Sequence, residues 1–294
     1  MIARLRFAWL LVLPLLPAAC GDEGPSPQPP SPLEFVACSL PAKTLGACYG
    51  LATTLCRPGV DPSGSPPAGT IGIEYDPQQQ PDRVRLHDRQ GVPRFEAVLD
   101  WDSQGRLSAI DEDLDGDGDV DRLTRVSWPS VGLPDQLTVE APDGTLLRLV
   151  DLDYQQGFLQ ERTTRDGEGT PLSFERYDWT EGRLAWRTLE DGQGTPREFE
   201  DQWYDGQGRL SGRTLRDGEG NAVSMTRWDW QDDRMTGRTD LGPDGFTVRR
   251  QAAYGYDAEG RLRDETRTGD ADRTLEYRYD ARGNLASVTV TSPL

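Results

Sequence analysis

Residues 111–121, with the sequence DEDLDGDGDVD, hold the densest group of side chains that could bind a ligand. Carboxylates recur at every second position of this stretch, at Asp113, Asp115, Asp117, Asp119 and Asp121. Alternating carboxylates can converge on a hard cation, and Gly118 at the sixth position of the loop permits a sharp turn. We therefore expect a Ca²⁺ site at a hairpin tip, in which Asp119 binds through its backbone carbonyl and the other four residues bind through carboxylates.

This loop departs from the usual calcium loop in two respects. Its twelfth position is Thr124, which cannot supply a bidentate carboxylate, and no helix is predicted on either side. The affinity is therefore expected to be weak, on the order of 10⁻⁴–10⁻³ M. The alternative is a solvated acidic turn that holds no metal.

Catalytic chemistry has little support. His87 is the only histidine, so a Ser-His-Asp triad would have to use this residue and metal sites with several histidines are excluded. Its charged neighbours Arg85, Asp88 and Arg89 indicate a surface position. Two carboxylates could still act together in glycoside hydrolysis, but no pair stands out among the acidic residues. We predict that the protein is not an enzyme, with a carboxylate-dependent hydrolase as one alternative.

The charge balance restricts the partners. The 294-residue chain has 50 acidic and 32 basic side chains, a net charge of −18. Phosphate binding needs a basic surface, so nucleic acid is excluded as a partner, whereas an acidic surface suits solubility and cation binding. A composition this polar would indicate disorder, but eight Trp, nine Tyr and a regular repeat indicate an ordered β protein.

The N-terminus has the pattern of an export signal. Residues 1–19 contain basic Arg4 and Arg6, then an apolar run that is shorter than the roughly 20 residues of a membrane-spanning helix. Small residues precede Cys20, and the arrangement resembles a bacterial lipoprotein signal, although Pro17 stands where that pattern usually has Leu. The resemblance implies lipidation of Cys20, membrane attachment and, because Gly21 follows, location at the outer membrane. Ordinary secretion is the alternative.

Three further segments precede the main domain. Residues 20–34 are a Pro-rich linker behind the lipid anchor, residues 35–56 form a cysteine-containing module, and residues 57–70 form a second linker. The module contains Cys38, Cys48 and Cys56, which in an exported protein favour one disulfide whose pairing stays open. Their spacing, without a nearby histidine, does not favour a metal site.

Residues 71–294 repeat with a period of about 25 residues. The apolar partners Leu159, Leu184, Leu210, Met235, Leu262 and Leu285 follow one another at intervals of 25, 26, 25, 27 and 23 residues. An aromatic residue opens each copy, and the openers are Tyr75, Trp101, Trp128, Tyr154, Trp179, Tyr204, Trp230, Tyr256 and Tyr279. A period of this length is too short for a four-stranded propeller blade, which needs about 40 residues.

Each period predicts one β-hairpin. Asp-Gly pairs such as Asp217-Gly218 favour tight hairpin loops, and the stretches between turns alternate with period two. Leu275, Tyr277 and Tyr279 are predicted to face one way, and Glu276 and Arg278 the other. The fold class is therefore all-β, with tandem hairpins that form one long curled antiparallel sheet carrying rings on one surface and charges on the other. Whether the sheet closes stays open.

Rows of aromatic side chains on such a sheet have two interpretations. The candidate binding rings are Trp228, Trp230, Tyr254, Tyr256, Tyr277 and Tyr279. They could stack on sugar rings, but a sheet with so few apolar residues needs the same rings for its core. Packing is the favoured interpretation, and a glycan platform is the alternative.

The motifs Tyr256-Asp-Ala-Glu-Gly-Arg-Leu and Tyr279-Asp-Ala-Arg-Gly-Asn-Leu, with close copies at Trp101 and Tyr204, resemble the Rhs/YD-repeat family. The resemblance covers about three-quarters of the chain. In that family such repeats build spiralling hairpin shells of polymorphic toxins and teneurin-like surface proteins. The self-cleaving core region and a C-terminal toxin are missing from this sequence, and about nine hairpins look too few for a closed cocoon.

These observations together predict an exported, lipid-anchored repeat protein that serves as a non-catalytic binding or structural surface module. Its expected partners are the membrane, through the anchor, and a glycan or another surface protein. Alternatives are a glycan-binding, adhesin-like module and an accessory of a YD-repeat toxin system.

Overall fold

The computed structural model describes residues 69–129, 132–269 and 272–291, and every regular element in these ranges is a β-strand. The strands are β1 (Gly69–Tyr75), β2 (Pro81–His87), β3 (Pro93–Trp101), β4 (Leu107–Asp113), β5 (Arg122–Ser127), β6 (Gln136–Glu140), β7 (Leu146–Gln155), β8 (Phe158–Asp166), β9 (Pro171–Thr180), β10 (Arg183–Asp191), β11 (Pro196–Tyr204), β12 (Leu210–Asp217), β13 (Ala222–Gln231), β14 (Arg234–Leu241), β15 (Val248–Tyr256), β16 (Leu262–Gly269), β17 (Arg273–Tyr279) and β18 (Leu285–Thr291). The predicted all-β class and the hairpin repeat are confirmed. No helix long and apolar enough to cross a membrane occurs in these ranges.

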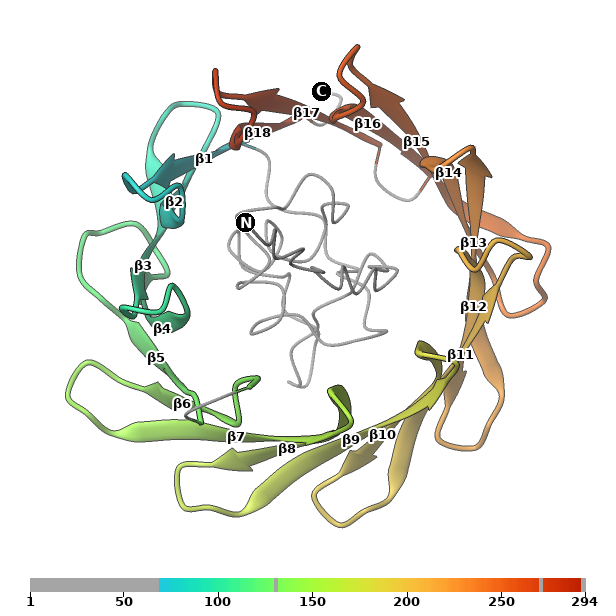
Figure 1. The fold of residues 1–294 in the computed structure, drawn as a ribbon. Coiled ribbons are helices and arrows are strands. Elements are labelled where there is room, and N and C mark those ends of the chain that lie inside the picture. Colours follow the sequence, from blue (N-terminus) through green and yellow to red (C-terminus); the bar gives the residue numbers. More distant parts are fainter. Residues whose placement is uncertain (1–68, 130–131, 270–271, 292–294) are drawn as a thin grey trace, which may run out of the picture.

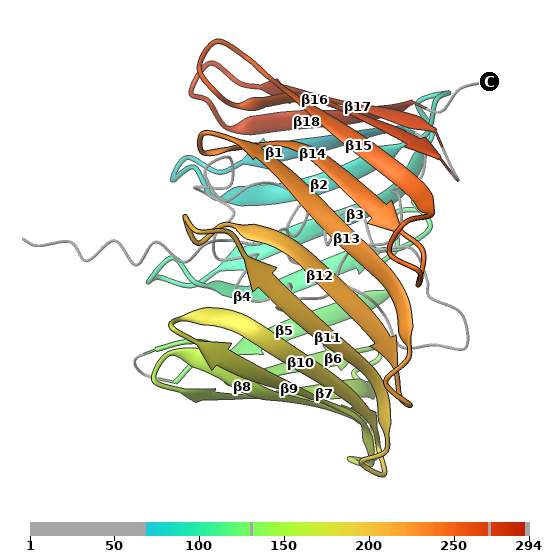
Figure 2. The same ribbon diagram turned by 90° about the vertical axis from the view of Figure 1, so that its right-hand side faces the viewer.

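The 18 strands form one antiparallel sheet that closes on itself (Figure 1). Each strand pairs with the next along the chain, and β1 also pairs with β18, with Gly69 opposite Val290 and Ile71 opposite Val288. The strands slant across the wall of the resulting ring (Figure 2). The predicted long curled antiparallel sheet is thus confirmed, and the structure settles the point that the sequence left open, since the sheet closes. Twist and coiling bring the last edge back to the first, and closure removes both exposed edges.

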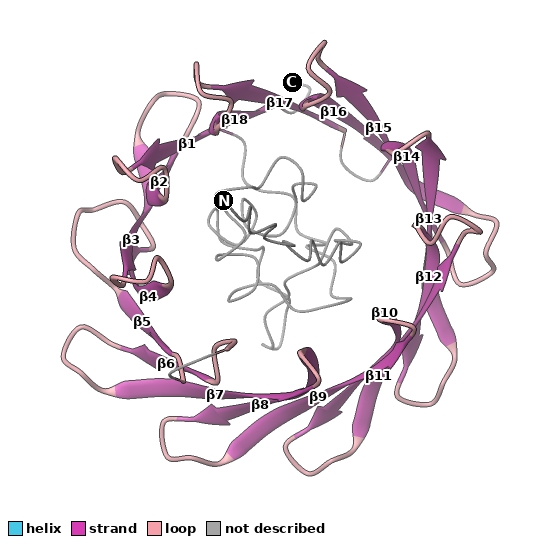
Figure 3. Cartoon of the chain, viewed as in Figure 1, coloured by secondary structure: helices cyan, strands magenta, loops and turns pink. Residues whose placement is uncertain are grey.

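The number of hairpins is sufficient for a ring. Eighteen strands about 4.8 Å apart need a circumference of at least about 86 Å, and hence a diameter of about 27 Å or more. Nine hairpins are therefore enough to close a single ring, and the expectation that they are too few for a closed cocoon stays a prediction. The two kinds of turn lie at opposite rims, because the odd-numbered strands end at the opener turns and the even-numbered strands end at the Asp-Gly turns (Figure 3).

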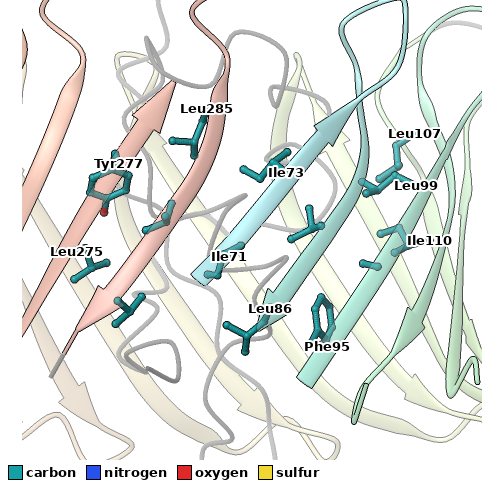
Figure 4. Close-up of a cluster of buried hydrophobic side chains, with 14 of the residues drawn as sticks. Ile71, Ile73, Leu86, Phe95, Leu99, Leu107, Ile110, Leu275, Tyr277 and Leu285 are labelled. Atoms are coloured by element: carbon teal, nitrogen blue, oxygen red, sulfur yellow. The ribbon is translucent and has the colours of Figure 1, made fainter. Parts of the chain in front are cut away.

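One face of the wall is buried and the other is exposed. In β1, for example, Ile71 and Ile73 are buried, whereas Thr70 and Glu74 are exposed. All described strands belong to the one ring and none is layered outside it, so the buried face is the concave, inner one. The largest apolar cluster on this face is formed by Ile71, Ile73, Val84, Leu86, Phe95, Ala97, Leu99, Leu107, Ile110, Val126, Leu137, Val150, Leu262, Leu275, Tyr277, Leu285, Val288 and Val290 (Figure 4). It extends over both sides of the seam between β18 and β1.

A repeated hydrogen bond, made by eight of the nine openers, fastens a hairpin to the preceding one. The polar atom of an opener ring donates to a backbone carbonyl of the preceding copy, over 2.6–2.9 Å. The pairs are Trp101 to Pro81, Trp128 to Leu107, Trp179 to Leu159, Tyr204 to Leu184, Trp230 to Leu210, Tyr256 to Met235, Tyr279 to Leu262, and Tyr75 to Leu285. The last pair joins the first copy to the final one. A buried Tyr or Trp needs such a partner for its polar tip, and this explains why the opener is Tyr or Trp.

The Gly-Arg-Leu step adds further contacts between neighbouring hairpins. Arg209 pairs with Asp205 of its own turn at 2.7 Å, and its guanidinium lies 5.6 Å from the ring centre of Trp230 in the next copy. The carboxylate of Asp205 also accepts the backbone N–H of Arg209, and Gly208 takes a positive φ. The motif therefore shapes its own turn and covers the following opener.

Candidate functional site

Two sectors of the inner face differ in the side chains that they carry. On β17, β18 and β1–β7 it is mainly apolar, and we call this the apolar sector. It also contains a buried charge, Glu112, which pairs with Arg122 at 2.7 Å. On β8–β12 the middle of the inner face holds a line of alternating charges, which we call the charged row: Arg162, Glu175, Arg187, Glu200 and Arg213.

The strand register places the charged row on the same face as the rings. Arg162 is directly opposite Glu175, and Arg187 is opposite both Tyr177 and Glu200. The expectation that rings and charges separate onto two surfaces is thus corrected on these strands. Charges can lie on the inner face of these strands because they are paired. Each buried charge has an opposite charge on a neighbouring strand, and their attraction offsets the free-energy cost of removing the charge from water.

Each member of the charged row contacts its neighbours. Arg162 lies 2.7 Å from Glu175, and Arg187 lies 3.5 Å from Glu175 and 3.7 Å from Glu200. Arg213 lies 3.3 Å from the same carboxylate oxygen of Glu200 that faces Arg187. The relative exposures of Glu175, Arg187 and Glu200 are 0%, 3% and 1%. Arg187 therefore sits between Glu175 and Glu200 at the centre of the row, and Glu198 beside the row also binds its guanidinium.

Burial and pairing act in opposite directions on these groups. Burial lowers the pKa of Arg187, but attraction to Glu200, Glu198 and Glu175 outweighs it, so the pKa is raised and the guanidinium stays charged. Burial also raises the pKa of Glu200, and the charges of Arg213 and Arg187 oppose that rise. The row depends on its full set of partners, since one missing charge would leave another buried and uncompensated.

Polar atoms without a partner lie next to the charged row. Thr164 and Ser173 face each other across β8 and β9, and both are buried. Within the described chain, their hydroxyls and the Nε of Arg187 have no hydrogen-bond partner. A buried unpaired polar group costs about 1–3 kcal/mol, so this part of the inner face favours water or a polar group as a neighbour.

The acidic loop joins β4 to β5. Asp113, Asp115 and Asp117 each bring a carboxylate oxygen within 4.8 Å of the other two. Asp119 and Asp121, the other predicted ligands, have roles within the loop: Asp119 donates its N–H to Asp117, and Asp121 accepts the N–H of Leu114 at 2.7 Å. The structure thus brings together three of the five predicted ligands.

Asp113 is the anchor of this loop. Its carboxylate accepts the backbone N–H groups of Gly116 at 2.6 Å and Gly118 at 2.8 Å. Burial raises the pKa of Asp113, but these two N–H groups outweigh it and hold the pKa below its ordinary value. Its carboxylate therefore stays ionised and fixed, and the donor set is one that a hard cation such as Ca²⁺ accepts.

The predicted binding rings lie in the wall of the ring. Trp228 and Tyr277 are buried, and Tyr277 donates to Glu265 on β16 at 3.1 Å. Trp230, Tyr256 and Tyr279 donate the repeated bond to the preceding copy. Tyr254, also partly buried, packs against two of the apolar clusters. The geometry thus agrees with the packing interpretation of these residues.

Several predicted features lie outside the described residues. These are the export signal, the lipidation site Cys20 and the disulfide candidates Cys38, Cys48 and Cys56. The charged row, by contrast, was missed by the sequence analysis. The sequence does contain a signal for it, because a charge an even number of residues from a ring lies on the same face of a strand. Glu175 precedes Tyr177 by two residues, and Glu200 precedes Tyr204 by four.

Comparisons with known proteins identify one repeat directly. A family model described as RHS Repeat matches residues 256–294. No curated protein matched the chain. Among solved structures, a TcdB2-TccC3-TEV structure is similar at 15% identity and a TM-score of 0.28, over 78% of this chain and 15% of that one. A porin-like protein from Bacteroides uniformis is similar at 12% identity and a TM-score of 0.38, over 78% and 98%.

The chain thus spans about 15% of the length of the first of these structures. TM-scores of this size do not bear on function, so the family match is the informative result. Its segment contains the opener Tyr256 with Gly260, and the opener Tyr279 with Gly283. The chain therefore carries an RHS repeat at residues 256–294, the segment whose Tyr-Asp motifs resembled that family.

Proposed function

We propose that this protein is an exported, lipid-anchored, non-catalytic module of the bacterial outer membrane, and that its ring is a structural and binding scaffold. The observation that carries the proposal is the closed wall, in which the same opener hydrogen bond recurs from copy to copy and also spans the seam from Tyr75 to Leu285. Every hairpin so joined is held on both sides, which suits a rigid scaffold.

The inner carboxylates support a structural role. Glu175 and Glu200 share the guanidinium of Arg187, which lies between them. Glu175 also binds Arg162 and accepts the hydroxyl of Tyr177 at 2.9 Å. A glycoside hydrolase needs two carboxyl groups that flank a substrate, whereas these two flank an arginine.

Two measurements test this function. Intact mass and membrane fractionation of the wild-type chain and of Cys20→Ser test the anchor: we expect a lipid-modified, membrane-bound wild type and an unmodified, released variant. A wild-type chain that begins unmodified at Gly21 would refute the anchor. Turnover on a polysaccharide panel that disappears in Glu175→Gln would refute the non-catalytic role.

A further inference from the structure

The inner face of β14–β17 carries more positive than negative charge. The strand register places six charged residues on this face, together with the buried ring of Tyr277. Four of them are arginines and two are acids: Arg238, Asp240, Arg250, Glu265, Arg267 and Arg273. These strands therefore have an excess of two positive charges on their inner face, whereas the whole chain has a net charge of −18.

The carboxylate nearest to Arg250 along the register is occupied by other donors. Asp240 lies directly opposite Arg250, across β14 and β15. Both carboxylate oxygens of Asp240 accept from the guanidinium of Arg238, at 2.9 and 3.1 Å, and one of them also accepts the hydroxyl of Thr226 at 3.0 Å. Within the described chain, the buried Nε of Arg250 has no hydrogen-bond partner. This donor therefore favours an acceptor from outside the sheet.

Two like charges face each other on the next pair of strands. Arg267 lies directly opposite Arg273, across β16 and β17, and like charges in this arrangement destabilise a sheet. Glu265 pairs with Arg267 at 2.5 Å and also accepts the hydroxyl of Tyr277 at 3.1 Å. Burial lowers the pKa of Arg273, and the charges of Arg267 and Arg250 lower it further. Arg273 is therefore close enough to both of the other arginines to be repelled by them.

The three arginines lie near one rim of the ring. Arg250 is the third residue of β15 and Arg273 is the first residue of β17, and both strands begin at the rim of the Asp-Gly turns. Arg267 stands two residues before the end of β16, at the same rim. The nearby carboxylate of Asp272 accepts the N–H of Gly269 at 2.9 Å. All three arginines are half-buried, so a small anion can reach them without unfolding the sheet.

We propose that Arg250, Arg267 and Arg273 form a binding site for a phosphate group. A guanidinium presents its N–H groups in a planar fork that matches the oxygens of a phosphate. A phosphate monoester carries about −1.5 to −2 charges at pH 7, which matches the two excess positive charges better than a carboxylate does. The ligand is a small anion, because the net negative charge of the chain repels a polyanion such as nucleic acid. The proposal does not depend on the lipid anchor or on the absence of catalysis.

Calorimetry on the full chain with inorganic phosphate tests the proposal, at an ionic strength held constant with sodium chloride. The wild type is compared with Arg250→Gln and Arg273→Gln. Arg278→Gln is the matched control, because it removes the same charge from the outer face of β17, where the side chain is 73% exposed. We expect the control to bind phosphate as the wild type does, and each inner variant to bind it about tenfold more weakly or worse. Glycerol 1-phosphate is the second probe, and tighter binding than that of inorganic phosphate would assign the site to a phosphate ester.

The wild type also supplies a test that needs no variant. Phosphate should raise its Tm above the value in chloride at the same ionic strength, because a ligand that binds the folded chain stabilises it. An unchanged Tm, or equal phosphate affinity in the wild type and in Arg250→Gln, would overturn the proposal. Acetate that binds as tightly as phosphate would overturn it too, since the site would then be one for carboxylates.

Discussion

The hydroxyl of Tyr75 donates a hydrogen bond to the carbonyl of Leu285 at 2.9 Å, although the two residues lie 210 positions apart in the chain. The same bond joins consecutive copies elsewhere, as from Tyr279 to Leu262 at 2.7 Å. Beside it, Asn284 donates to Gln79 at 2.8 Å across the same seam. The first and last copies therefore meet in nearly the way that any two neighbouring copies do.

Loss of the Tyr75 hydroxyl should weaken the seam. We expect Tyr75→Phe to lower the free energy of unfolding by about 1 kcal/mol, because the carbonyl of Leu285 loses its partner. Hydrogen exchange should also accelerate in β1 and β18. Tyr204→Phe, which removes the equivalent bond to Leu184, is the control and should leave exchange at the seam unchanged. Similar hydrogen-exchange rates in β1 and β18 of both variants would show that the ring does not open preferentially at the seam.

The charged row should be sensitive to loss of one partner. Glu175→Ala leaves Arg187 and Arg162 buried without this carboxylate, and we expect a cost of about 3–5 kcal/mol in urea unfolding. Glu276→Ala, at an exposed position, should cost less than about 0.5 kcal/mol. The double variant Glu175→Leu with Arg187→Met should recover part of the loss. A cost at Glu175 equal to that at Glu276 would contradict the proposed role of the row.

A close contact outside the ring predicts a strained variant. A Cβ atom at Gly212 would lie 2.1 Å from the ring of Trp203, so Gly212→Ala must displace that ring. We expect a loss of about 1–3 kcal/mol and a change in tryptophan fluorescence. In a Trp203→Ala background the same substitution should cost much less. Equal costs in the two backgrounds would show that Trp203 is not the obstacle.

Acid should destabilise the ring through its turns. The hydroxyl of Thr247 and the backbone N–H groups of Phe246 and Thr247 lower the pKa of Asp244 to about 2. The pKa of Asp205 is lowered as well, first by the N–H of Arg209. The unfolded chain binds more protons than the folded chain below about pH 4, so stability present above that pH is lost as pH falls toward 2.

Urea unfolding between pH 5 and pH 2 measures this loss. Asp244→Asn should be less stable than the wild type at pH 5, and the two should converge toward pH 2, because only the wild type loses an ionised carboxylate. A constant difference between the two proteins over this range would contradict the lowered pKa of Asp244.

We propose that the acidic loop binds Ca²⁺ weakly. Calorimetry should give a Kd on the order of 10⁻⁴–10⁻³ M for the wild type and no binding for Asp115→Ala or Asp117→Ala. Asp143→Ala, in the plain turn between β6 and β7, is the control and should bind as the wild type does. The same absence of heat in the wild type and in the Asp115 variant would leave a solvated acidic turn.

The local structure followed from the sequence because its causes are local. Asp-Gly pairs and glycines with positive φ, such as Gly208 and Gly260, fix where the chain turns, and alternation of side chains between turns fixes the strands. The 25-residue period, the hairpins and the openers as packing residues were all predicted on these grounds. Three of the predicted metal ligands also converge, because they stand close together in one short turn.

Closure and the charged row were decided by the tertiary structure. Whether β18 meets β1 depends on the twist and coiling accumulated over all 18 strands, and no single period contains that sum. The pairing of Arg187 with Glu175 and Glu200 depends on register and on which face becomes concave. The sequence by itself therefore determined the repeating unit, whose interactions are short-range. The fold of the whole ring determined which charges are buried and where the two ends of the sheet join.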